Sequence, residues 1–506
     1  MKPHMKEPFR IIVLAAVAGL LAGCAVGPNF HRPKPPVSQT YASDNQPLET
    51  VETSGPGGNA QRFHIGMDIP AQWWSLFRSD SLDRLVRVAL ENSPTLAQAQ
   101  ARLKQAQEDL NARTGATQYP AVDAALSITR QQVDLSSLGV SNIPNPGPFT
   151  LYNASVSASY TLDLFGGNRR ALEGLKAKVD YQDFELEAAK QTLAANVVNA
   201  AIQQASLRAR IAIAQGLMDA QGQQLAITEE RHKAGGVSLL DVQNQSILLD
   251  QTTATLPPLK KQLAQVNHQL AIYLGMEPAE AKIDGFDLND LHLPEELPLS
   301  LPSSLARQRP DIRAAEALWH QASANVGVAA ANLFPQITLN GSFGSQRVDS
   351  GELLSGINIW SVAGKIMQPI FHGGELRARE RLAVAAYDEA AAAYKQIVLK
   401  GLQEVADTLY AIDADARTLK ARTDTTNHAR SGYEIAQRQY QLGGISHLAL
   451  LDAQRQLLQT EMDRTQAQAD RYADTATLLY ALGGGWSEPI PENARLNSTS
   501  APEIQK

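Results

Sequence analysis

The sequence predicts a mixed α and β fold in which long helices dominate and four short strands interrupt them. Three observations carry this prediction. Two proline-free stretches of about 65 residues are rich in Ala, Gln, Leu and Glu, four segments alternate apolar and polar residues, and similar segments return at an offset of roughly 206 to 216 residues. The chain has 506 residues, too many for one ordinary compact core, so several domains or an elongated shape are expected.

The overall composition excludes several classes of protein. It is 44% hydrophobic and 19% charged, which is typical neither of a disordered chain nor of a polytopic helical membrane protein. The net charge of -7 and the pI of about 5.9 argue against a nucleic-acid-binding surface.

The N-terminus has the pattern of a lipoprotein signal peptide over residues 1–23. Basic residues precede the short apolar run "IIVLAAVAGLLAG", which ends at Cys24, the only cysteine of the chain. The segment "LAGC" resembles the bacterial lipobox, in which the cysteine receives a diacylglyceryl group; the alternative is an ordinary signal peptide with an incidental cysteine. Ala25 in place of an aspartate favours the outer membrane. Residues 24–70 are rich in Pro, Gly, Ser and Thr and predict an extended tether.

The remaining chain predicts two copies of one plan. "RHKAGGVSLLDVQNQ" at 231–245 corresponds to "QYQLGGISHLALLDAQRQ" at 439–456, and other segment pairs occur in the same order. We expect a first repeat at 71–283, with strands near 119–131 and 151–165 and a hairpin tip near 235–240. A second repeat is expected at 284–483, with strands near 335–346 and 357–371 and a tip near 443–450, followed by a tail at 484–506.

The two long helices are predicted at about 170–234 and 376–442. At 1.5 Å per residue the first would reach roughly 95 Å, and such helices suggest coiled-coil packing. The glycine pairs Gly235–Gly236 and Gly443–Gly444 end them, because glycine tolerates the left-handed backbone at a helix C-terminus. Pro257–Pro258 should break or kink the first return helix. On these features alone, a spectrin-like rod or a soluble bundle fits equally well.

The clearest strand is "YNASVSASYTLDL", residues 152–164, in which every second residue is apolar. Its polar set, with Asp123 from the preceding strand, is expected to face a water-filled lumen, while the apolar set faces lipid. This predicted lumen face comprises Asp123, Asn153, Ser155, Ser157, Ser159, Thr161 and Asp163.

The number of strands requires partner chains if the strands span a membrane. The second and fourth strands could each reach about 10 residues, the length that crosses a tilted bilayer. Backbone groups in hydrocarbon must all be paired, so a membrane sheet has to close, and barrels need about 8 strands. Two chains would give about 8 strands and three about 12, and the small serines favour the wider barrel. The alternative is a soluble β-sandwich.

Motifs for catalysis and cofactors are missing from the sequence. The histidines form no spaced ligand pair with a Cys or another His, so no metal site is expected. The glycine pairs lack the lysine of a phosphate loop, and no Gly-x-Ser-x-Gly elbow occurs. We therefore expect no enzyme activity and no cofactor.

The order and spacing of several segments resemble the TolC-like outer-membrane efflux protein family, most closely its lipoprotein branch that serves resistance–nodulation–division pumps. The segments include "WWSLF", "ALENSPTLAQAQARLKQAQ", "RQRPDIRAAE", "PIFHGGELRA" and "LLDAQRQLL". The resemblance implies a homotrimer with a shared outer-membrane β-barrel of about 12 strands above a periplasmic α-helical barrel. It also implies an adaptor protein docked at the tips marked by Gly235, Gly236, Gly443 and Gly444, and an inner-membrane transporter that delivers drugs or other small molecules.

The resemblance further implies a periplasmic gate at the second tip. Tyr440 and Asp452 match an aromatic and an acidic position that take part in closure, whereas Ile445 and Ala449 depart from charged closure residues of some relatives. Helix packing and a solvated face are the alternative roles of Tyr440 and Asp452. For the whole chain, the alternative to an exit duct is a lipid-anchored periplasmic coiled-coil scaffold or adhesin.

Overall fold

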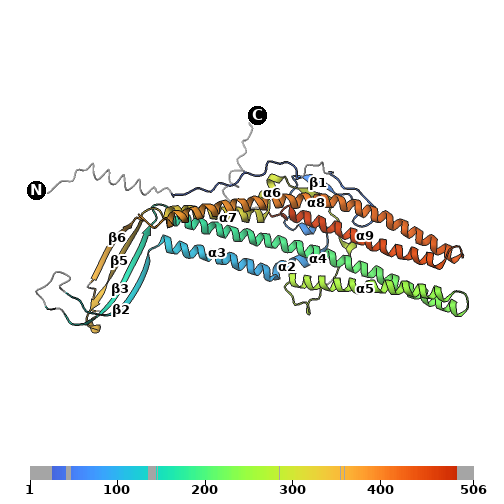
Figure 1. The fold of residues 1–506 in the computed structure, drawn as a ribbon, viewed down its shortest axis with the longest axis horizontal. Helices are drawn as coiled ribbons and strands as arrows, with labels where there is room; N and C mark the ends of the chain where they lie inside the picture. Colours follow the sequence, from blue (N-terminus) through green and yellow to red (C-terminus); the bar gives the residue numbers. More distant parts are fainter. Residues whose placement is uncertain are drawn as a thin grey trace, which may run out of the picture. The chain divides into compact units, whose positions relative to one another are not determined.

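The computed structural model describes residues 25–41, 47–134, 144, 146–283, 285–353, 355–357 and 359–486. The chain divides into two compact units (Figure 1). Among the described residues, the first unit comprises those within 25–32, 102–182 and 315–394, and the second comprises those within 33–101, 183–314 and 395–486.

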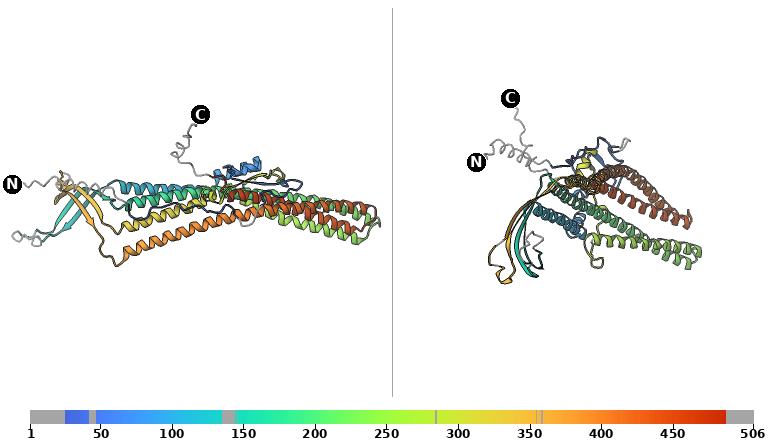
Figure 2. Two further views of the ribbon diagram at one scale, coloured as in Figure 1. Left: turned by 90° about the horizontal axis from the view of Figure 1, so that it is seen from above. Right: turned by 60° about the vertical axis from the view of Figure 1, so that its left-hand side comes forward.

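The first unit contains a four-stranded antiparallel sheet. Its strands are β2 (Ala121–Gln131), β3 (Phe149–Leu162), β5 (Gln336–Arg347) and β6 (Ile359–Met367). They are hydrogen-bonded in the order β2-β3-β5-β6, and the views of Figure 2 show them as one curved sheet. All four strands were predicted. The boundaries of the last strand differ most, because the structure ends it at Met367 rather than near residue 371.

The first unit also contains most of α3 (Pro94–Gln118) and α7 (Pro310–Ala331), the single turn η4 (Ser350–Glu352), and the starts of α4 (Gly167–Lys233) and α8 (Glu375–Gln441). An aromatic cluster packs here around Trp319, whose ring centroid lies 5.6 Å from those of Phe30 and Tyr387 and 5.7 Å from that of Tyr394. The cluster joins the N-terminal segment to two helices of the first unit.

The second unit contains two helical hairpins and a small core. The further parts of α4 and α8 lead into α5 (Leu239–Tyr273) and α9 (His447–Ala481). The short elements are β1 (Arg62–Ile65), η1 (Trp73–Phe77), α2 (Asp80–Asn92), η3 (Leu288–Asp290), β4 (Glu296–Leu299) and α6 (Pro302–Gln308). β1 pairs in parallel with β4. Leu297, Leu409 and Leu478 are among the residues of its buried cluster.

Both long helices have 67 residues and lie within three residues of the predicted bounds. The glycine stops are confirmed, since Gly235 has φ 75° and Gly443 has φ 76°. The expected break at Pro257–Pro258 is wrong, because α5 continues through both residues. The two prolines lack the N–H groups that would bond to the preceding turn. Burial of the adjacent Leu256 and Leu259 keeps this part of the helix packed.

In the part of the chain that the structure describes, no helix combines the length and the apolar character needed to cross a membrane.

Candidate channel surfaces

The strand register gives the sheet one polar and one apolar face. Residues directly opposite each other in an antiparallel pair share a face. Ser157 of β3 lies opposite Asp123 of β2 and Ser342 of β5, and Ser342 lies opposite Ser361 of β6. One polar row therefore crosses all four strands, and the predicted grouping of Asp123 with the serines of β3 is confirmed.

Other predicted residues follow the same face. Ser155 lies opposite Ala125, Ser159 opposite Asn340, and Thr161 opposite Thr338. Side-chain hydrogen bonds connect neighbouring strands here, with 2.8 Å between the hydroxyls of Ser342 and Ser361 and 3.5 Å between those of Thr161 and Thr338. Asn153 lies opposite Ser127, and its Oδ1 is buried without a hydrogen-bond partner in the described chain.

The opposite face of the sheet is apolar and exposed. Ala124, Val156, Phe343 and Trp360 form one of its rows. Trp360 is 75% exposed, although burial of such a side chain is strongly favourable in water. The large exposed side chains of this face also include Val122, Leu126, Ile128, Leu339, Val362 and Ile366. A face of this kind fits contact with lipid or with another apolar surface.

The prediction that Asp163 lies on the strand is wrong, because β3 ends at Leu162. The Asp163 carboxylate accepts hydrogen bonds from the backbone N–H groups of Asn168, at 3.1 Å, and Arg169, at 2.8 Å. Negative charge is favourable beside the exposed N–H groups at a helix N-terminus. Asp163 therefore stabilises the start of α4 and does not extend the polar face.

Both outer strands of the sheet lack a partner along one edge. In the order β2-β3-β5-β6, neither β2 nor β6 has a second neighbour among the described residues. The side chains of β2 are exposed from Ala121 to Arg130, and those of β6 from Trp360 to Met367. Each edge offers unpaired backbone groups to a further strand.

The predicted lipidation residue, Cys24, lies outside the described residues, but the segment after it is firmly held within the first unit. The buried guanidinium of Arg170 donates hydrogen bonds to the carbonyl oxygens of Val26, at 3.2 Å, and Gly27, at 3.3 Å, and to Asn29 Oδ1, at 2.7 Å. Arg170 also pairs with Glu173 at 2.7 Å. The start of the predicted tether is thus fixed beside the end of β3, where Val26 N–H donates to the Phe165 carbonyl.

The first hairpin tip, between α4 and α5, is closed by local hydrogen bonds. Gly235 N–H donates to the His232 carbonyl and Gly236 N–H to the Arg231 carbonyl, which satisfies the last turn of α4. Ser238 and Asp241 form a capping box at the start of α5.

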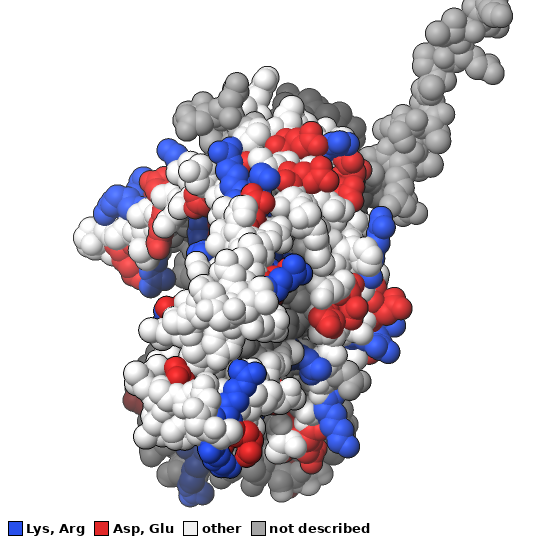
Figure 3. All heavy atoms as spheres, turned by 90° about the vertical axis from the view of Figure 1, so that its right-hand side faces the viewer, with Lys and Arg blue, Asp and Glu red and all other residues white. Residues whose placement is uncertain are grey.

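The second tip, between α8 and α9, repeats the turn with different side chains. Gly443 N–H and Gly444 N–H donate to the carbonyls of Tyr440 and Gln439. Ser446 caps α9 by accepting from Ala449 N–H. Figure 3 views the molecule from the side on which both turns lie in Figure 1, and acidic and basic side chains there surround broad uncharged areas.

The two predicted gate residues have different partners, and no hydrogen bond joins them in the described structure. The Tyr440 ring lies 5.1 Å from the His447 ring, between centroids. Asp452 is exposed and pairs with Arg455 at 3.0 Å. A residue that the sequence did not single out therefore contacts Tyr440.

His447 is that residue, and its imidazole is nearly completely buried, with 5% exposure. Neither ring nitrogen has a hydrogen-bond partner in the described chain. Burial lowers the pKa of His447; the charge of Asp241 opposes the shift and that of Arg231 adds to it. A single histidine at the first position of a helix gives no sequence signal for burial.

Candidate metal ligands do not gather at these surfaces. No group of three or more His, Cys, Asp or Glu side chains in the described residues is arranged to hold a metal ion.

Comparison with solved structures defines the class of this fold. An outer-membrane channel, OprN, aligns with 92% of this chain and 100% of its own, at a TM-score of 0.79 and 28% identity. The fold is therefore that of the outer-membrane channels.

Comparison of sequences defines the family. The model of the family described as "Outer membrane efflux protein" matches residues 85–276 and 301–484, and this chain belongs to that family. The pyoverdine export outer membrane protein OpmQ of Pseudomonas putida is 31% identical over 83% of this chain and 89% of its own. The outer membrane protein OprJ of Pseudomonas aeruginosa is 29% identical over 96% of this chain and 98% of its own.

Proposed function

We propose that this chain is the outer-membrane channel of a tripartite efflux system, a passive exit duct for drugs or other small molecules. An inner-membrane transporter would deliver the cargo through a periplasmic adaptor. Family membership and the names of the relatives support this role. The probable outer membrane lipoprotein SilC of Salmonella typhimurium, 28% identical over 93% of this chain, also supports lipid attachment at Cys24.

The observation that carries the proposal is a two-faced sheet with two open edges. If the apolar face of the sheet lies in lipid, the backbone N–H and C=O groups at the two edges cannot bond to water. Each edge must then pair with another strand. In a homotrimer, β2 of one chain would pair with β6 of the next, giving a barrel of about 12 strands around the polar face. The two repeats, 71–283 and 284–483, would each contribute two strands and one hairpin to this assembly.

The hairpins would form the periplasmic part of the duct. Their tips carry exposed leucines, Leu239 and Leu240 on the first and Leu442 and Leu448 on the second. These side chains, beside the glycine turns, offer an adaptor an apolar contact. Tyr440 and Asp452 would narrow the mouth at the second tip.

A pair of adjacent substitutions tests the assignment of the two faces. Ser157→Lys would add three positive charges to the lumen of a trimer, so we expect trimers that still assemble and whose ion selectivity in planar bilayers shifts towards anions. Ala158→Lys would place the same charge in lipid, at a cost of about 2–4 kcal/mol near the midplane, and should prevent assembly. SDS-resistant trimers in outer-membrane fractions are the readout.

The assignment fails if the two variants behave alike. If a chain whose only substitution is at Cys24 leaves the membrane as a soluble monomer, the anchored scaffold becomes the better explanation.

A further inference from the structure

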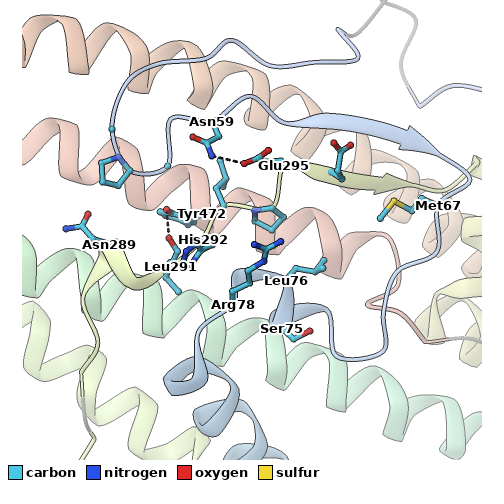
Figure 4. Close-up of a pocket in the computed structure, with 16 residues that line it drawn as sticks. Asn59, Met67, Ser75, Leu76, Arg78, Asn289, Leu291, His292, Glu295 and Tyr472 are labelled. Atoms are coloured by element: carbon cyan, nitrogen blue, oxygen red, sulfur yellow. Dashed lines mark hydrogen bonds between the residues drawn. The ribbon is translucent and has the colours of Figure 1, made fainter.

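The second unit contains a polar pocket that the proposed channel does not use. It has a volume of about 680 Å³, within the range of roughly 300–1,000 Å³ that is usual for small-ligand sites. Its walls are residues of the segments 55–59, 75–78 and 289–296, and Tyr472 of α9 also lines it (Figure 4).

Buried polar side chains hold these walls in place. Arg471 is fully buried, and its guanidinium donates to the carbonyl oxygens of Gly57, at 2.7 Å, and Asn59, at 2.8 Å. Burial lowers the pKa of Arg471 to about 10, which leaves it charged at neutral pH. The Tyr472 hydroxyl donates to the Leu291 carbonyl at 2.9 Å. The pocket is therefore formed in advance and does not depend on a ligand for its shape.

Arg78 lines the pocket with a guanidinium group that forms no hydrogen bond or ion pair with another described residue. Its exposed side chain extends into the pocket in Figure 4. Its backbone has φ 49° and ψ 42°, and it is the one described residue other than glycine with positive φ. This conformation costs an arginine about 1–2 kcal/mol.

The strained backbone at Arg78 points to a role for its side chain. The turn itself is set by its neighbours, since Phe77 is fully buried and Ser79 caps α2 through a hydrogen bond from Leu82 N–H. Glycine would adopt the same turn without strain. Strained residues of this kind occur preferentially at functional sites.

Two carboxylates line the same pocket. Glu295 accepts a hydrogen bond from Asn59 Nδ2 at 2.8 Å, and Glu296 contacts His64. Both glutamates are exposed and keep further acceptor positions. The hydroxyl of Ser75 and the amide of Asn289 add polar groups, and Leu76 and Leu293 add apolar surface.

We propose that this pocket binds a short peptide whose two ends are free. Arg78 would hold the terminal carboxylate, because a guanidinium matches a carboxylate with two parallel hydrogen bonds. Glu295 and Glu296 would attract the terminal ammonium, and the leucines would cover small apolar side chains. The two glutamates disfavour phosphates and other multiply charged anions by repulsion.

Calorimetric titration of the full-length chain in detergent tests the proposal, with trialanine as the probe. Trialanine amide lacks the carboxylate and N-acetyl-trialanine lacks the ammonium. We expect trialanine to bind, and each capped peptide to bind about tenfold or more weakly, since each loses a charge-assisted contact. Absence of trialanine binding, or equal binding of all three peptides, overturns the proposal.

Arg78→Gly gives an independent check, because it relaxes the backbone while removing the guanidinium. The variant should keep or raise the melting temperature and bind trialanine about tenfold more weakly. Arg84→Ala, a change on the adjacent helix α2 outside the pocket, is the matched control and should bind normally. Unchanged binding by Arg78→Gly also overturns the proposal. Neither peptide binding nor melting temperature depends on channel conductance. The peptide-binding proposal can therefore fail while the proposed channel function stands, and the reverse also holds.

Discussion

The two hairpin tips share one backbone design and differ in the side chains around it. Each long helix ends at a glycine pair, and each return helix begins with a serine cap. At matching positions the first tip has His232, Leu239, Asp241 and Asn244, and the second has Tyr440, His447, Ala449 and Asp452.

From these differences we expect the first tip to unfold locally less readily than the second. His232 Nδ1 lies 3.0 Å from the Val237 carbonyl, and the Ser238–Asp241 capping box satisfies two backbone N–H groups. The second tip has only the Ser446 cap and buries an imidazole with no hydrogen-bond partner in the described chain. Glycine and serine therefore set the turn, while neighbouring side chains set how readily each tip opens.

The largest expected effect comes from His447→Leu, which removes a buried polar ring that has no partner. We expect the second tip to become more stable by about 1–3 kcal/mol, the usual desolvation cost of such a group. Hydrogen–deuterium exchange of the tip amides measures this change. Leu239→Ala in the first tip, where the side chain is exposed, should change local exchange little.

His447 also predicts a pH dependence. The opened tip binds a proton near the ordinary pKa of 6.5, whereas burial lowers the pKa in the closed tip. The contribution of neutral His447 to the stability of the second tip is therefore complete above pH 6.5. It is lost as the pH falls from 6.5 towards the lowered pKa of the buried imidazole. In the wild type, the protection of the second-tip amides from hydrogen–deuterium exchange should decrease over this pH range. The His447→Leu variant should show no such decrease. The same decrease in the variant would exclude His447 as its source.

A smaller effect is expected at the proposed gate. Asp452→Ala combined with Tyr440→Phe removes the exposed ion pair with Arg455 and one hydroxyl. An exposed pair contributes about 0–1 kcal/mol, so the open population should rise by up to about fivefold. Single-channel recording in planar bilayers measures it, with His232→Ala and Asn244→Ala in the first tip as controls. Unchanged conductance would remove both residues from the gate.

An effect of comparable size is expected from exchanging the helix caps. Asp241→Ala should loosen the first tip by about 1 kcal/mol, because it destroys the capping box. Ala449→Asp builds the missing half of that box beside Ser446 and should tighten the second tip by about 0.5 kcal/mol. Tip exchange rates report both. If the exchange rates of the two tips in these variants still differ as they do in the wild type, the helix caps do not account for the difference in stability between the tips.

Much of the fold could be predicted because its signals are local. The long helices are proline-free and end at glycine pairs, so α4 and α8 were placed within three residues. The two faces of the sheet follow from period-2 alternation in β2 and β3, and the register confirms them. Family segments spread over the whole chain gave the class of channel.

The features that the sequence did not predict depend on contacts with backbone groups, which the pattern of side chains does not encode. Asp163 continues the alternation of polar and apolar residues in the sequence. In the structure its carboxylate instead accepts hydrogen bonds from backbone N–H groups at the start of α4. Arg170 binds the backbone carbonyl oxygens of Val26 and Gly27. Arg471 binds those of Gly57 and Asn59, and any sequence would offer such acceptors. The pattern of side chains in a sequence therefore does not predict which backbone carbonyl groups will accept these hydrogen bonds.

The open edges of the sheet also constrain how the protein matures. A sheet exposing Trp360 and Val362 at an unpaired strand would adhere to other chains in water. In the proposed trimer, β2 and β6 are protected only when all three chains are present. Completion of the sheet and association of the chains would then be a single event, whose rate rises steeply with chain concentration at the membrane.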